Sequence, residues 1–144
     1  MLFRRRNREP GPGRPPLLTW RSETRFDIGS LRFELLLHDV FSEKTSEDKI
    51  IILKERVTLT RMLDLIGRES PRRAFEFGIF QGGSTLMWTL ALGLDRMAAV
   101  DVGESVPELA NMACRTGYSF STAARRPTVP GWRRSWTMYL ADAM

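Results

Sequence analysis

Hydrophobic and polar positions give the middle of the chain a clear pattern of elements. Residues 74–77 and 97–102 are short apolar runs of the kind found in buried parallel strands. Residues 83–92 between them are apolar on almost every side, as expected for a helix covered by other elements. A capping box at residues 105–108 predicts a second helix that ends near Gly117. The pattern therefore predicts a β–α–β–α unit from residue 74 to Gly117.

The segment before this unit has a weaker pattern. Residues 26–41 are rich in apolar side chains with mixed spacing, which allows either a strand or a short helix. Thr45 followed by Asp48 resembles a capping box, and apolar positions then recur at helical spacing. We therefore expect a helix over about 46–66, with Lys54 on its solvent face.

Charge is distributed unevenly along the chain. The net charge is +5 and the isoelectric point is about 10.1. Residues 1–25 carry seven Arg and two Glu, residues 115–144 carry five Arg and one Asp, and residues 26–114 have a net charge of −4. Because the patterned part is acidic, a basic surface for nucleic acid is not expected on the fold, and nucleic acid is a disfavoured partner.

These patterns divide the chain into four parts. We expect a disordered Arg- and Pro-rich tail over 1–25 and an N-terminal helical segment over 26–72. An α/β half-domain is expected over 73–120, and an irregular basic tail over 121–144.

Single reactive residues limit the chemistry. Cys114 is the one cysteine and His38 the one histidine, so neither an internal disulfide nor a cysteine- or histidine-rich metal cluster is expected, and we predict no metal site. His38 is expected to face solvent. No apolar run is long enough to cross a membrane, and the N-terminus lacks the apolar core of a signal peptide, which predicts a cytoplasmic protein.

A glycine-rich turn joins the first strand of the unit to its helix. Glycines in such a turn let the backbone approach a ligand, and the amides at the helix start favour a polar or anionic group. Asp101 ends the next strand, where a carboxylate can accept hydrogen bonds from the hydroxyls of a ribose. We therefore expect a nucleoside-containing ligand at this edge of the sheet. The alternative is that the glycines only form a tight strand-to-helix turn.

The glycine spacing indicates which nucleoside is favoured. The dinucleotide pattern G-x-G-x-x-G and the lysine of a P-loop are both absent. Glu76, Gly78 and Gly82 instead match motif I of the class I S-adenosylmethionine-dependent methyltransferases, E/D-x-G-x-G-x-G, although Phe80 replaces the middle glycine. The turn most resembles the branch that contains cephalosporin hydroxylase-like and macrocin-type O-methyltransferases. The match covers about 45 residues.

This resemblance implies a fold, a cofactor and a site. The fold would be α/β, a partial Rossmann-like parallel sheet with flanking helices, and the cofactor S-adenosyl-L-methionine. The reaction would be O-methyl transfer to a small-molecule or sugar acceptor. No catalytic residue can be named, because the branch holds its substrate on the second half of the sheet. The implied cofactor-binding residues are Glu76, Gly78, Phe80, Gln81, Gly82, Gly83, Ser84 and Asp101.

The end of the sequence departs from the α/β pattern. Only 42 residues follow Val102, so we expect the second half of the sheet to be missing. One hypothesis is a shift of the reading frame near Phe120, because a shifted frame with GC-rich codons would read ADRPRLAEIVDDVF, an amphipathic helix. A natural basic tail is the alternative. The nucleotide sequence of the gene decides between them.

Other functions stay open at this point. A nicotinamide-dependent oxidoreductase would also bind a nucleotide at this turn, although the glycine spacing disfavours it. A non-catalytic protein could use its Arg-rich ends to bind an acidic partner. An open sheet edge would also favour aggregation or pairing with another chain, which leaves a homo-oligomer open.

Overall fold

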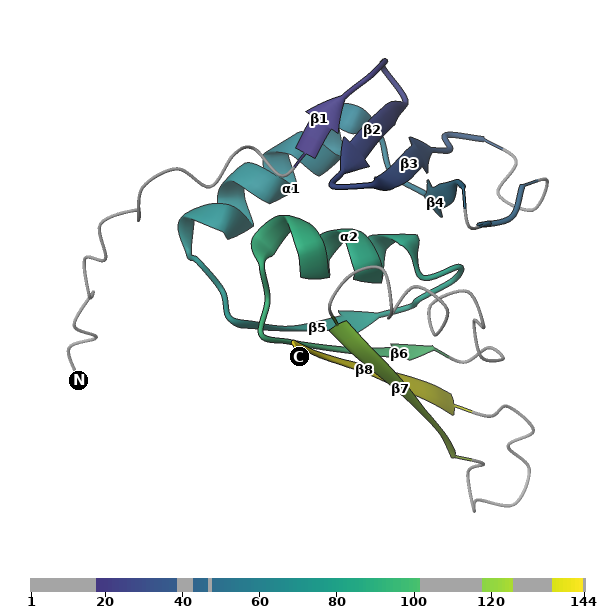
Figure 1. The fold of residues 1–144 in the computed structure, drawn as a ribbon, viewed down its shortest axis with the longest axis vertical. Helices are drawn as coiled ribbons and strands as arrows, with labels where there is room; N and C mark the ends of the chain where they lie inside the picture. Colours follow the sequence, from purple (N-terminus) through teal and green to yellow (C-terminus); the bar gives the residue numbers. More distant parts are fainter. Residues whose placement is uncertain (1–17, 39–42, 47, 102–117, 126–135, 144) are drawn as a thin grey trace.

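The computed structural model describes residues 18–38, 43–46, 48–101, 118–125 and 136–143. These residues form two four-stranded sheets and two helices (Figure 1). The predicted helix over 105–116, with Cys114, lies outside the described residues. His38 is exposed, as expected.

The N-terminal sheet has the strand order β1-β2-β3-β4. Strands β1 (Leu18–Trp20), β2 (Arg25–Ile28) and β3 (Leu31–Leu35) are antiparallel, and β4 (Ile50–Ile52) lies parallel to β3. Alternate residues of β2 and β3 are buried, which is the pattern of a sheet with one face on the core. The Phe26 and Phe33 rings of neighbouring strands stack with their centroids 5.1 Å apart.

The C-terminal sheet has the strand order β5-β6-β8-β7. Strands β5 (Arg73–Phe77) and β6 (Arg96–Asp101) are parallel and are joined by α2 (Gly83–Leu92), which confirms the predicted strand–helix–strand unit. Strands β7 (Tyr118–Arg125) and β8 (Trp136–Ala143) are antiparallel to each other, and β8 pairs antiparallel with β6. The sheet is therefore mixed: the expected parallel pairing holds for β5 and β6, whereas β8 and β7 add antiparallel strands.

Helix α2 occupies the centre of the molecule. It packs against β2 and β4 of one sheet and β6 of the other, so that it lies between the two sheets (Figure 1). Leu86 and Met87 are completely buried, and most of their helix is buried with them. This position explains why the helix sequence is apolar on almost every side: most of its residues are buried, and the rest are partly covered.

The second helix, α1 (Arg56–Arg68), packs one face on the core. Leu59 is completely buried, and Met62, Leu63 and Ile66 are partly buried against the same core. The predicted start of this helix at residue 46 is wrong by ten residues.

Strand β4 explains that difference. Residues 50–52 are three consecutive isoleucines, a β-branched run that favours a strand, and all three are buried. The Thr45 hydroxyl accepts a hydrogen bond from the Ile51 amide at 3.1 Å instead of capping a helix. The described residues within 26–72 thus form three strands and one helix, and are not mainly helical as expected.

The predicted limit of the N-terminal tail is also wrong, because β1 lies within residues 1–25. Contacts of Trp20 hold this strand on the rest of the protein. Its ring packs against Phe26, with centroids 4.9 Å apart, and the Arg56 guanidinium lies 4.4 Å from its centroid.

The expected irregular tail over 121–144 contains most of a β-hairpin. Strands β7 and β8 are rich in aromatic residues and threonine, which favour strands. The prolines and most of the arginines that led to the expectation of an irregular tail fall between the two strands. The composition of the whole tail therefore obscured two short segments with high strand propensity.

Candidate functional site

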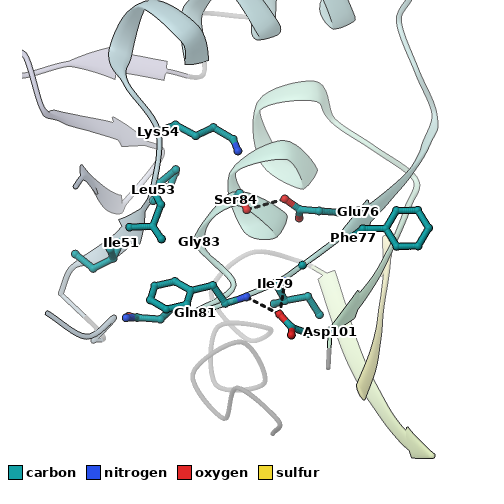
Figure 2. A pocket seen from close by; sticks show the side chains of 13 residues that line it. Ile51, Leu53, Lys54, Glu76, Phe77, Ile79, Gln81, Gly83, Ser84 and Asp101 are labelled. Carbon is teal, nitrogen blue, oxygen red and sulfur yellow. Dashed lines mark hydrogen bonds between the residues drawn. The ribbon is translucent and has the colours of Figure 1, made fainter. Parts of the chain in front are cut away.

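A cavity of about 500 Å³ lies where β5 ends and α2 begins (Figure 2). The carboxyl end of β6 and the residues that follow β4 complete its walls. Seven of the eight predicted site residues line it, whereas Gly82 is buried and does not. The lining residues are Ile51, Ile52, Leu53, Lys54, Glu76, Phe77, Gly78, Ile79, Phe80, Gln81, Gly83, Ser84 and Asp101.

The Asp101 carboxylate contacts the glycine turn directly. Its Oδ2 atom accepts hydrogen bonds from the backbone amides of Ile79 at 2.5 Å and Phe80 at 2.8 Å. The predicted meeting of turn and carboxylate is therefore confirmed. The two amides serve the protein's own carboxylate, however, so they are not available to an anionic ligand. The contact instead fixes Asp101 at the rim of the cavity.

The turn has an alternating backbone conformation. Gly78, Phe80 and Gly82 have φ values of 82°, 52° and 79°, all in the left-handed region. These are the three positions at which the methyltransferase motif has glycine. Such alternation directs successive amides to one point and makes a concave anion-binding loop, and here that anion is Asp101.

Phe80 is strained in this turn. A left-handed conformation costs a residue with a side chain about 1–2 kcal/mol. The Phe80 amide is one of the two that bind Asp101, so the carboxylate offsets part of that cost. A strained residue beside a cavity is the arrangement seen at functional sites.

Glu76 connects the end of β5 to the first turn of α2. One carboxylate oxygen accepts a hydrogen bond from the Ser84 hydroxyl at 2.7 Å, and the other accepts one from the Thr85 hydroxyl at 2.6 Å. A negative charge at a helix N-terminus is favourable, because the helix dipole is positive there. Glu76 therefore holds the turn in shape as well as placing a carboxylate on the cavity wall.

Gln81 fastens the turn to the segment before β4. Its amide nitrogen donates a hydrogen bond to the Glu43 carbonyl at 2.8 Å, and its amide oxygen accepts one from the Thr45 amide at 2.5 Å. Both the nitrogen and the oxygen of the side-chain amide are thus hydrogen-bonded to the protein backbone. Gln81 lines the cavity, but its observed hydrogen bonds are structural.

The two remaining glycines have different roles. A Cβ on Gly78 would meet no atom within 4 Å, so this glycine leaves open space at the cavity. A Cβ on Gly83 would overlap the Ile51 carbonyl oxygen and lie 2.8 Å from the carbonyl carbon. Gly83 is therefore needed for the close packing of α2 on β4, which agrees with the purely structural alternative for that position.

Sequence reasoning missed one wall of the cavity. Leu53 and Lys54 follow β4 and line the cavity, although Lys54 was expected on the solvent face of a helix. The run of three isoleucines was the available signal. Interpreted as a strand, it would have placed Lys54 just beyond a strand end, where ligand-binding residues gather in α/β folds.

In the described part of the chain, neither helix has the length and apolar character needed to cross a membrane. Comparisons of this chain with protein-family models, curated proteins and solved structures find no match.

Proposed function

We propose that this chain binds S-adenosylmethionine in the cavity at the end of β5, as the cofactor-binding part of a Rossmann-like class I methyltransferase. The observation that carries the proposal is the contact between the Asp101 carboxylate and the left-handed turn beside a cavity of about 500 Å³. That volume is within the range of small-molecule sites, about 300–1,000 Å³.

The residues present fit the ligand in two ways. Asp101 lies at the end of the second parallel strand, where its carboxylate can accept hydrogen bonds from ribose hydroxyls. Gly78 leaves free space where any other residue would place a side chain, so the backbone can contact the ligand closely.

The chemistry supplied by the bound cofactor would be an electrophilic methyl group on a sulfonium. The residues of this chain would hold the nucleoside and the amino-acid end in a fixed position, which is the main requirement of methyl transfer. We propose that the methyl acceptor is a small molecule with a nucleophilic oxygen. We assign no catalytic residue.

Calorimetric titration with S-adenosylhomocysteine tests this function. We expect saturable binding at one site per chain in the micromolar range, and no binding of NADH. Circular dichroism establishes in parallel that the protein is folded. Absence of binding to the folded protein would overturn the proposal, and binding of NADH alone would support the nicotinamide alternative.

A further inference from the structure

Lys54 brings a positive charge to a cavity whose other ionisable groups are acidic. It lies two residues beyond the end of β4, and its side chain is half-buried. Figure 2 shows the side chain extending from the β4 side of the cavity toward Ser84 and Glu76. None of the ion pairs in the described ranges includes Lys54.

The opposite wall carries the two carboxylates of the site. Glu76 is the penultimate residue of β5, and Asp101 is the last residue of the parallel strand β6. Each carboxylate accepts two hydrogen bonds from the turn or from α2. A ligand in the cavity therefore meets an ammonium on one side and carboxylates on the other. A group that carries both charges, such as an α-amino acid, matches this arrangement.

The position of Lys54 follows from the packing of two backbones. Because Gly83 brings the start of α2 against Ile51, the residues that follow β4 stand beside the first turn of α2. Leu53 adds an apolar surface to the same wall of the cavity. An ammonium on a flexible stem in this position can bind a carboxylate with a charge-assisted hydrogen bond.

We infer that Lys54 binds the carboxylate of an amino-acid group at one end of the ligand and makes the site selective for ligands that have this group. This inference rests on the proposed function. It assigns a role in ligand specificity to Lys54, a residue outside the glycine motif.

Two ligands that differ in the amino-acid group test this inference. S-Adenosylhomocysteine and 5′-methylthioadenosine share the adenosine and the thioether, but only the first has the α-amino acid. We expect the wild-type chain to bind S-adenosylhomocysteine at least about tenfold more tightly, because one charge-assisted contact to a carboxylate is worth about that factor.

Substitution of Lys54 separates its role from general packing. In Lys54→Met, we expect the affinity for S-adenosylhomocysteine to fall about tenfold and that for 5′-methylthioadenosine to stay unchanged. Lys54→Arg should restore most of the lost affinity. The matched control is Lys44→Met, which removes an exposed lysine that does not line the cavity and should change neither affinity.

The outcomes distinguish this inference from the function on which it rests. If both ligands bind and Lys54→Met changes neither affinity, or lowers both equally, the role of Lys54 is wrong and the cofactor site stands. If neither ligand binds the folded wild-type chain, the proposed function is wrong and the inference falls with it.

Discussion

Gly83→Ala is expected to lower the free energy of unfolding by about 3 kcal/mol, at the upper end of the usual cost of overpacking. The added Cβ would overlap the Ile51 carbonyl oxygen, which is backbone and cannot rotate away. Helix α2 would have to separate from β4, although the contact between them lies in the buried core. Urea unfolding followed by circular dichroism measures the loss.

Gly67→Ala provides the matched control. This glycine lies in α1, and a Cβ there would meet nothing within 4 Å. Alanine should leave stability unchanged or raise it by up to about 1 kcal/mol, because it favours the helix and restricts the unfolded chain. Equal unfolding midpoints for the two variants would contradict the close packing of α2 on β4.

Asp101→Ala is expected to lower the free energy of unfolding by about 2 kcal/mol and to abolish measurable binding of S-adenosylhomocysteine. The substitution removes the acceptor of two backbone amides, each in a charge-assisted hydrogen bond. The left-handed strain at Phe80 then loses the hydrogen bond that offsets part of it, and the turn loses its fixed shape. Urea unfolding and calorimetry measure the two effects.

Two further variants identify the cause of that loss. Asp101→Asn keeps an oxygen acceptor for the amides, so its loss of stability should be about half of that in Asp101→Ala. Asp64→Ala removes an exposed carboxylate from α1 and should change stability by no more than about 0.5 kcal/mol. Wild-type stability and ligand affinity in Asp101→Ala would show that the carboxylate does not organise the site.

The strand–helix–strand unit could be predicted because its signals agree. Apolar runs of strand length flank an apolar stretch of helix length, and glycine stands at both ends of α2. The N-terminal sheet gave weaker signals. Its strands have three to five residues, too few to establish a period, and β4 lies within a stretch whose apolar spacing also fits a helix.

The composition of the site was more predictable than its hydrogen bonds. The motif spacing placed Glu76 and Gly78, and the end of the second strand placed Asp101, at one edge of the sheet, where they line the cavity. Which groups bind one another depends on the conformation of the turn and on β4, a strand distant in sequence. The Gln81 contacts with residues 43–45 and the location of Lys54 in the cavity therefore could not follow from the motif.

The C-terminal strands β7 and β8 were not predicted, for a different reason. The methyltransferase fold that the sequence resembles continues with a second half of the sheet. Because the pattern of that half is absent here, we expected it to be missing and the tail to be irregular. In the structure, β8 pairs antiparallel with β6. Strand β7 in turn pairs antiparallel with β8 over eight residue pairs. Strand pairing is satisfied by backbone groups, so it does not require the sequence pattern of the expected fold.

The most direct test of the central claim is to locate bound S-adenosylhomocysteine by amide chemical shifts in an NMR titration. The account predicts that the amides of Gly78, Gly83 and Ser84 shift with saturation, together with those near Asp101, and that Gly29 and Gly67 stay unmoved. Shifts confined to the N-terminal sheet, or none at saturating ligand, would contradict it.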